Sequence, residues 1–221
     1  MDFPLVSCIT PTYNRRHFFH RAVRCFLSQD YPNLEWVILD DGTDPIKDLL
    51  PDDPRIKYHP IPPKLAHGPK MDHCFELSSG EYGIVFDDDD WYAPDRVRLQ
   101  IEPLIANPSF QVSGLSNFYY YDIGKQIAYL YQSKQVPWIG AIALRRSSWA
   151  SIRFDSDPKP GADNRLLMKI PKDARCDIRD LPRLLVAAIH PTNDCKKHIT
   201  NSYSSVPYDT VVKITGGDLC L

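Results

Sequence analysis

Short apolar runs alternate with helix-spaced and polar segments in the first half of the chain. Residues 5–10, 36–39 and 83–86 are continuous apolar or small runs, typical of strands buried on both faces. Between the first two runs, apolar residues recur at helical spacing over 16–28, and Asn14 is a candidate N-cap. A strand, a helix and a strand in this order predict a right-handed parallel crossover. We therefore expect an α/β fold with a mostly parallel central sheet flanked by helices.

The second half has a different pattern. Aromatic and β-branched runs at 112–121 and 127–131 surround the turn residues 122–125, which predicts a smaller antiparallel region.

Other elements are expected in both halves of the chain. They are a polar loop at 64–70, a helix at 71–79, a helix that starts at Pro94, a strand at 139–144, a helix at 165–170 and a strand at 184–189. From residue 192 onward the polar tail predicts no element.

Four consecutive carboxylates, Asp87 to Asp90, follow the third apolar run. Two carboxylates about 4 Å apart repel by about 1 kcal/mol in water and by about 4 kcal/mol near a protein surface, so this cluster needs hydration or a counter-cation. In an extended chain Asp87 and Asp89 share one face. Converging carboxylate oxygens suit a divalent cation such as Mg²⁺ or Mn²⁺. A solvated acidic loop is the alternative.

Polar residues also end the other two strands, at 11–14 and 40–42. The carboxyl ends of parallel strands lie at one edge of an open sheet, and ligands bind there. We therefore expect the three polar clusters to converge. Two acidic strand ends beside the P-T-Y-N loop predict a metal-assisted nucleotide site.

Composition and charge narrow the possible partners and compartment. The formal net charge of -2, with scattered lysines and arginines, provides no basic field for nucleic acid, so we expect no nucleic-acid partner. No apolar run approaches about 18 residues and the N-terminus enters a strand pattern at once, so we expect neither a signal peptide nor a membrane span. The six cysteines form no C-x-x-C pair, which favours reduced thiols in a cytoplasmic protein.

These motifs resemble those of the family 2 glycosyltransferases, whose nucleotide-sugar-binding domain has the α/β fold called GT-A. The matching stretches, in order, are V-S-C-I-T-P-T-Y-N-R at 6–15, F-L-S-Q-D-Y-P-N-L-E at 26–35, I-L-D-D-G-T-D at 38–44 and S-G-E-Y-G-I-V-F-D-D-D-D-W at 79–91. Weaker matches continue to about His190. The resemblance implies one GT-A domain over 1–221, Rossmann-like, with a nucleotide-binding half to about 110, an acceptor and catalytic half over about 111–190, and a tail.

The resemblance also implies roles for individual residues. Asp41 would accept a hydrogen bond from uracil, Asp88 would touch the ribose, and Asp89 would hold the metal on the diphosphate with Asp87 nearby. His190 would close over the metal and diphosphate, and Asp163 in G-A-D-N-R-L-L looks like the catalytic base. The other implied nucleotide contacts are Pro11, Thr12, Tyr13, Arg15, Gly68 and Lys70.

The activity implied is inverting transfer of a hexose from a UDP-sugar to a hydroxyl of a glycan, lipid or protein, with Mn²⁺ or Mg²⁺. Ala162 stands where the family often has Glu, and the expected Arg-Asn pair is replaced near Asp72-His73. The chain lacks the C-terminal region of many relatives, which is compatible with one domain of a larger polypeptide. The alternative functions are a sugar-nucleotide nucleotidyltransferase, whose Gly-rich loop is absent here, and a non-catalytic nucleotide-sugar-binding module.

Each implied role has a structural alternative. Asp41 and Asp163 are also suited to capping turns or helices. His190 is equally suited to hydrogen bonding within a loop, and Tyr13 to core packing.

Overall fold

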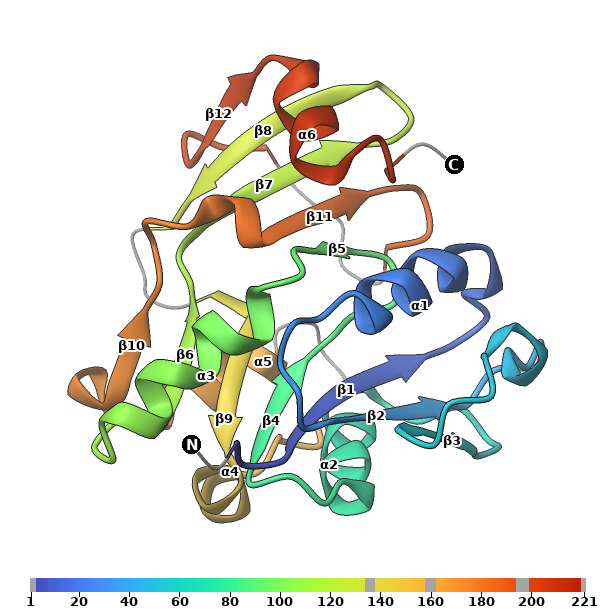
Figure 1. Cartoon of the computed structure of the whole chain (residues 1–221), viewed down its shortest axis with the longest axis vertical. Helices are drawn as coiled ribbons and strands as arrows, with labels where there is room; N and C mark the ends of the chain where they lie inside the picture. Colours follow the sequence, from blue (N-terminus) through green and yellow to red (C-terminus); the bar gives the residue numbers. More distant parts are fainter. Residues whose placement is uncertain (1–2, 134–137, 158–161, 194–198, 220–221) are drawn as a thin grey trace.

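The computed structural model describes residues 3–133, 138–157, 162–193 and 199–219, and its centre is a seven-stranded sheet (Figure 1). The strand order is β10-β6-β9-β4-β1-β2-β3. Strand β9 runs antiparallel to both of its neighbours, and the other pairs are parallel. The expected α/β fold with a mostly parallel sheet is therefore confirmed. The strands are β1 Val6–Thr12, β2 Leu34–Asp40, β3 Ile56–Pro60, β4 Tyr82–Val85, β6 Val112–Leu115, β9 Trp138–Arg145 and β10 Arg175–Asp177.

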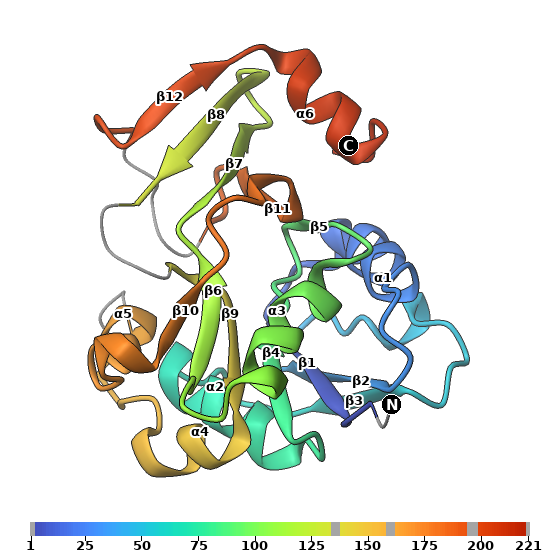
Figure 2. The same ribbon diagram turned by 60° about the vertical axis from the view of Figure 1, so that its left-hand side comes forward.

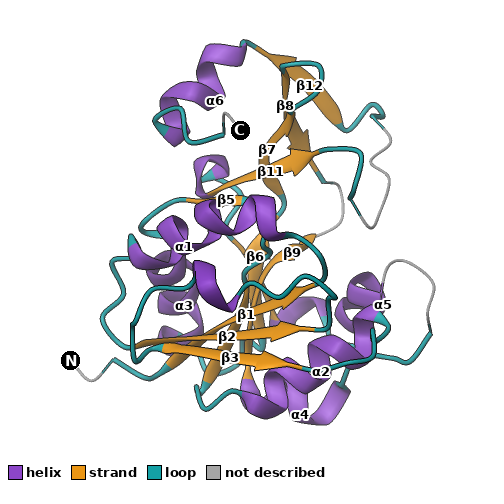
Figure 3. Cartoon of the chain, turned by 90° about the vertical axis from the view of Figure 1, so that its right-hand side faces the viewer, coloured by secondary structure: helices purple, strands orange, loops and turns teal. Residues whose placement is uncertain are grey.

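Alternating side chains of the central strands enter two separate cores. Trp36 and Ile38 of β2 pack in one core, whereas Val37 and Leu39 pack in the other. All four are fully buried, because helices cover both faces of the sheet (Figure 3). The helices are α1 Phe19–Leu27, α2 His67–Leu77, α3 Arg96–Ala106, α4 Arg146–Ile152, α5 Ala162–Met168 and α6 Tyr208–Thr215, with short 3₁₀ helices at Arg16–Phe18, Lys47–Leu49, Lys172–Ala174 and Pro182–Leu184.

A second sheet of five strands, in the order β12-β8-β7-β11-β5, lies above the central sheet in the view of Figure 2. Its pairs are antiparallel, except that β11 runs parallel to β7. The smaller region predicted as antiparallel is thus mixed. Its strands are β5 Trp91–Tyr92, β7 Asn117–Asp122, β8 Ile127–Gln132, β11 Leu185–Ile189 and β12 Tyr203–Val206.

Several expected elements differ from the structure. The run 112–121 is not one strand, because β6 joins the first sheet and β7 joins the second, with Ser116 between them. The polar tail contains β12, which pairs with β8, and α6. Asn14 does not cap α1. It has a positive φ of 53°, and its Oδ1 instead accepts backbone N–H groups of Thr43 and Asp44.

Helix α2 begins at His67, so Gly68 and Lys70 lie in its first turns and not in a polar loop. Pro69 does not prevent this start, because the first N–H groups of a helix have no intrahelical partner. Every helix in the part of the chain that the structure describes is too short or too polar to cross a bilayer.

Candidate functional site

The carboxyl ends of β1, β2 and β4 meet at one edge of the central sheet, which we call the rim. Thr12 lies opposite Asp40 in the β1–β2 register, and the Asp41 N–H donates to the Thr12 carbonyl oxygen at 3.3 Å. Strand β4 pairs with the other side of β1, and the Phe86 N–H donates to the Ile9 carbonyl at 2.9 Å. The chain enters the acidic loop directly after Phe86. The structure therefore brings the three polar clusters together.

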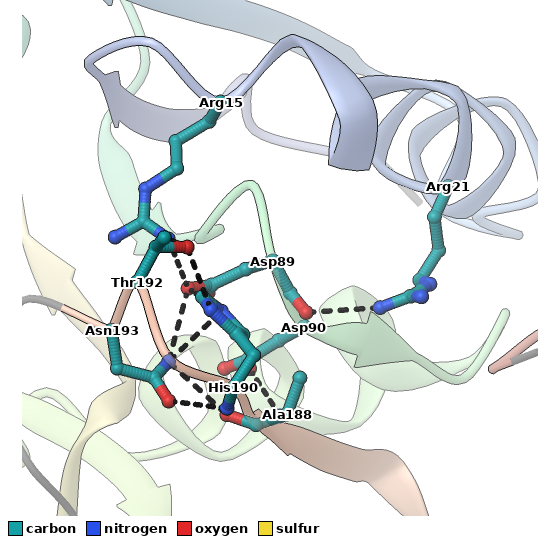
Figure 4. Close-up of polar contacts among 8 residues, drawn as sticks. All are labelled: Arg15, Arg21, Asp89, Asp90, Ala188, His190, Thr192 and Asn193. Atoms are coloured by element: carbon teal, nitrogen blue, oxygen red, sulfur yellow. Dashed lines mark hydrogen bonds and ion pairs between the residues drawn. The ribbon is translucent and has the colours of Figure 1, made fainter. Parts of the chain in front are cut away.

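Asp89 is at the centre of a compact polar group (Figure 4). Its Oδ2 lies 3.0 Å from His190 Nε2 and 3.4 Å from Asn193 Nδ2. Arg15, which is buried, places Nη1 3.6 Å from the same oxygen. The Asp89 side chain is only 16% exposed. Segments that follow β1, β4 and β11 thus meet at this carboxylate.

His190 is oriented by the two residues that follow Pro191. Its backbone N–H donates to Asn193 Oδ1 at 2.8 Å, and its Nδ1 lies 3.0 Å from Thr192 Oγ1. Arg15 Nη1 donates to the same Thr192 hydroxyl at 3.1 Å. Asn193 Nδ2 also lies 3.0 Å from His190 Nε2. The sequence reading missed Thr192 and Asn193, although both follow His190 in the motif H-P-T-N.

Asp88 is buried beside Thr12 at the same edge. Burial, and next the charge of Asp89, raise the pKa of Asp88 to about 8, while Thr12, Arg15 and Lys70 lower it. The Thr12 hydroxyl lies close to the Asp88 carboxyl and favours its charged form. Even so, among the described residues neither Thr12 Oγ1 nor Asp88 Oδ2 has a hydrogen-bond partner of acceptable geometry. Two buried oxygen atoms here can thus still bond to a ligand.

Asp41 and Lys70 form a buried ion pair. Lys70 Nζ lies 2.5 Å from Asp41 Oδ1, and it also donates to the Thr12 carbonyl. The Leu65 N–H donates to Asp41 Oδ2 at 2.6 Å. The Asp41 side chain has no exposed surface, and that of Lys70 is 7% exposed. Both oxygens of Asp41 are therefore bonded to groups within the protein. A uracil ring could bond to them only after Lys70 or Leu65 moves away.

Gly68 has a packing role that is sufficient to explain a glycine. A Cβ atom at this position would lie 2.0 Å from the carbonyl oxygen of Asp155. The start of α2 thus packs directly on the backbone that leads toward α5. A role for Gly68 in nucleotide binding stays a prediction.

Other residues implied at the site have different surroundings. Tyr13 is half-buried, and Lys64 Nζ lies 3.8 Å from the centroid of its ring. Pro11 lies within β1 and is half-buried. The Asp87 N–H donates to the Tyr92 hydroxyl at 2.7 Å. Asp163 is the second residue of α5, but its side chain lies outside what the structure describes.

Residues 7–155, more than half of the chain, match the sequence model of the family described as Glycosyl transferase family 2. The chain belongs to this family. Its sequence is 27% identical over 145 residues to an uncharacterized glycosyltransferase of Haemophilus influenzae, covering 63% of this chain and 57% of that protein. It is 30% identical over 112 residues to a UDP-Glc:α-D-GlcNAc-diphosphoundecaprenol β-1,3-glucosyltransferase of Escherichia coli, covering 48% and 44%.

The fold is that of the GT-A glycosyltransferases. A mannosyltransferase from Pyrobaculum calidifontis in complex with GDP-Man and Mn²⁺ superposes with a TM-score of 0.67 and 17% identity, covering 88% of this chain and 59% of that one. This family 2 chain thus spans between about two fifths and three fifths of the length of these three proteins.

Two side chains at the rim of this family 2 chain are suited to a divalent cation. In the described part of the chain, no group of three or more His, Cys, Asp or Glu side chains could hold a metal ion. Asp89 Oδ2 and His190 Nε2 are 3.0 Å apart, which matches the separation of roughly 3 Å between adjacent ligands of an octahedral ion at about 2.1 Å. Magnesium is commonly held by one or two carboxylates plus substrate phosphates. The residues fit an ion that binds together with a diphosphate.

Proposed function

We propose that this chain transfers a hexose from a UDP-sugar to an acceptor hydroxyl in glycan synthesis, with inversion and with Mn²⁺ or Mg²⁺. The observation that carries the proposal is the pair Asp89–His190 beside the buried Asp88, at the carboxyl edge of a parallel sheet. The E. coli relative supports a UDP-sugar donor through its name. The P. calidifontis mannosyltransferase, whose structure is in complex with GDP-Man and Mn²⁺, supports the cation.

The rim residues suit the binding of a diphosphate leaving group. Asp89 and His190 would hold the cation, and Arg15 adds a positive charge 3.6 Å from Asp89. A divalent cation held there would stabilise the negative charge that grows on the leaving diphosphate. Burial and the charge of Asp89 raise the pKa of Asp88, so this carboxyl accepts a proton more readily than an ordinary aspartate before ligand binds. Its unpaired Oδ2 can then exchange a hydrogen bond with a ribose hydroxyl.

The acceptor side requires a base for the attacking hydroxyl. One carboxylate within hydrogen-bond reach of that hydroxyl is sufficient. We assign this role to Asp163, which stands at the start of α5. Direct displacement by a single attack inverts the anomeric carbon. The name of the E. coli relative, which acts on a GlcNAc-diphosphoundecaprenol, supports a sugar hydroxyl as the acceptor.

Calorimetry of UDP binding with and without Mn²⁺ tests the proposal. The wild-type chain should bind UDP only when Mn²⁺ is present, and Asp89→Asn should abolish this binding. Asp44→Asn is the matched control, because Asp44 is an exposed carboxylate on the loop after β2. Equal binding by wild type and Asp89→Asn would remove the site that we propose.

A further inference from the structure

Arg21 is a buried cation behind the acidic loop. This residue of α1 is 3% exposed, and its Nη1 donates to the backbone carbonyl oxygen of Asp89 at 3.0 Å (Figure 4). Its Nε donates to the carbonyl oxygen of Asp218, after α6, at 3.2 Å. Burial lowers the pKa of Arg21, while the charges of Asp90, Asp218 and Asp89 act in the opposite direction. One guanidinium therefore joins the acidic loop to the segment 216–219.

Arg21 also contacts the ring that supports His190. Its guanidinium carbon lies 5.9 Å from the centroid of Phe18, within the range of a cation–π contact. The Phe18 ring in turn packs against His190, with ring centroids 4.4 Å apart. Arg21 is thus linked to both residues of the Asp89–His190 pair, through the backbone of one and through a ring that touches the other.

The direction of the Asp89 side chain depends on the backbone that carries it. Asp89 lies in a loop and not in a strand, so no sheet ladder fixes its carbonyl. The next residue is anchored separately, because Asp90 Oδ1 accepts the Ala188 N–H at 2.9 Å. With Asp90 held by β11, the bond from Arg21 fixes the peptide unit between these two aspartates. A hydrogen bond from a charged donor is stronger than one between neutral groups.

We propose that Arg21 is a positioning residue, which fixes the Asp89 backbone so that its carboxylate faces His190 and couples this loop to residues 216–219. The inference rests on the proposed function for the role of Asp89 in donor binding. The positioning of the Asp89 backbone does not depend on that function, and it can be measured in the ligand-free protein.

Hydrogen exchange of the ligand-free protein tests the positioning directly. Arg21→Met should raise the exchange of the peptide that spans 87–91 by about tenfold, since the bond that limits local opening is lost. The Mn²⁺-dependent affinity for UDP should fall by about the same factor. Arg21→Lys keeps the charge with fewer donors, so its exchange should lie between those of Arg21→Met and wild type. The lysine variant also provides a test if Arg21→Met does not fold.

Two control variants disturb only the other side of the link. Arg24 is half-exposed and pairs with the Asp218 carboxylate, whereas Arg21 uses the Asp218 carbonyl. Arg24→Gln and Asp218→Asn should therefore leave the exchange at 87–91 within about twofold of wild type. The proposal is overturned if both Arg21 variants leave the exchange at 87–91 unchanged and show faster exchange only at 216–219. Arg21 would then stabilise the C-terminal segment and not the acidic loop. If wild type binds no UDP with Mn²⁺, the proposed function fails, but the exchange data still decide the role of Arg21.

Discussion

Asp89 Oδ2 lies 3.0 Å from His190 Nε2, although the two residues are 101 positions apart in the sequence. One follows β4 of the central sheet, and the other follows β11 of the second sheet. The two sheets therefore each contribute one side chain to this pair, where their strand ends meet.

His190→Ala should weaken Mn²⁺ binding in the presence of UDP by roughly tenfold or more, because a lost ligand costs at least as much as a lost outer-shell partner. Titration of Mn²⁺ by electron paramagnetic resonance measures this affinity. His17→Ala is the control, since His17 packs on the same Phe18 ring, 4.0 Å between centroids, but is exposed. Equal losses in both variants would show that packing around Phe18 is the cause, and not ligation.

Asp163→Asn should lower sugar transfer by about 10² to 10⁴-fold, the usual contribution of a general base. Binding of UDP with Mn²⁺ should remain, because the base acts on the acceptor and not on the nucleotide. Asn164→Ala, at the exposed neighbouring position of α5, should keep near-normal turnover. Full transfer activity in Asp163→Asn would assign the base to another residue.

Asp88 should make the free energy of unfolding depend on pH. Its pKa of about 8 in the folded protein lies above the unfolded value, which is near 4. The folded state therefore binds an extra proton between these values, so the stabilisation is full below about pH 4 and is lost as the pH rises through 8. From pH 5 to pH 9, wild type should lose on the order of 4 kcal/mol relative to Asp88→Asn.

Urea unfolding of the ligand-free proteins at both pH values measures this difference. Asp44→Asn should follow the wild-type curve, since Asp44 is exposed. Parallel pH profiles for wild type and Asp88→Asn would contradict the raised pKa.

Lys70→Met should destabilise the fold by about 3 kcal/mol or more, because removing one partner of a buried ion pair leaves the other charge uncompensated. The uncompensated group is Asp41, whose side chain has no exposed surface. The double variant Lys70→Met/Asp41→Asn should recover at least half of the loss, as measured by urea unfolding. Lys64→Met, at an exposed lysine, is the control. A double variant as unstable as the single one would mean that Lys70 acts through packing.

The sequence indicated the strands and their polar ends well, because both signals are local. Buried runs such as 36–39 followed by Asp40 and Asp41 require no knowledge of distant residues. Parallel topology then places these ends at one edge, which is why most of the rim was predictable. The roles assigned to Asp41, Asp88, Asp89 and the other rim residues came from the family resemblance and stay predictions.

The parts that sequence reasoning missed depend on long-range pairing. Strand β12 (Y-S-S-V) has little apolar content and is stabilised by its register with β8, more than 70 residues earlier. Helix α2 starts at His67, but its apolar residues begin only at Met71. The sequence pattern therefore predicted a loop for the first turn of this helix. Arg21 looked like one polar residue on an amphipathic helix, and only the structure shows that it is buried against Asp89 and Asp218.

The junction at Ser116 has a mechanical consequence. A single residue separates β6 from β7, and Asp177 holds it by accepting from both its N–H and its hydroxyl, at 3.1 and 2.8 Å. The chain therefore has no spare length at this junction, and the central sheet and the second sheet cannot shift relative to each other here without breaking those bonds. A chimera that takes β7 and β8 from a relative would have to retain Ser116 and Asp177, or the second sheet would lose its alignment with the rim.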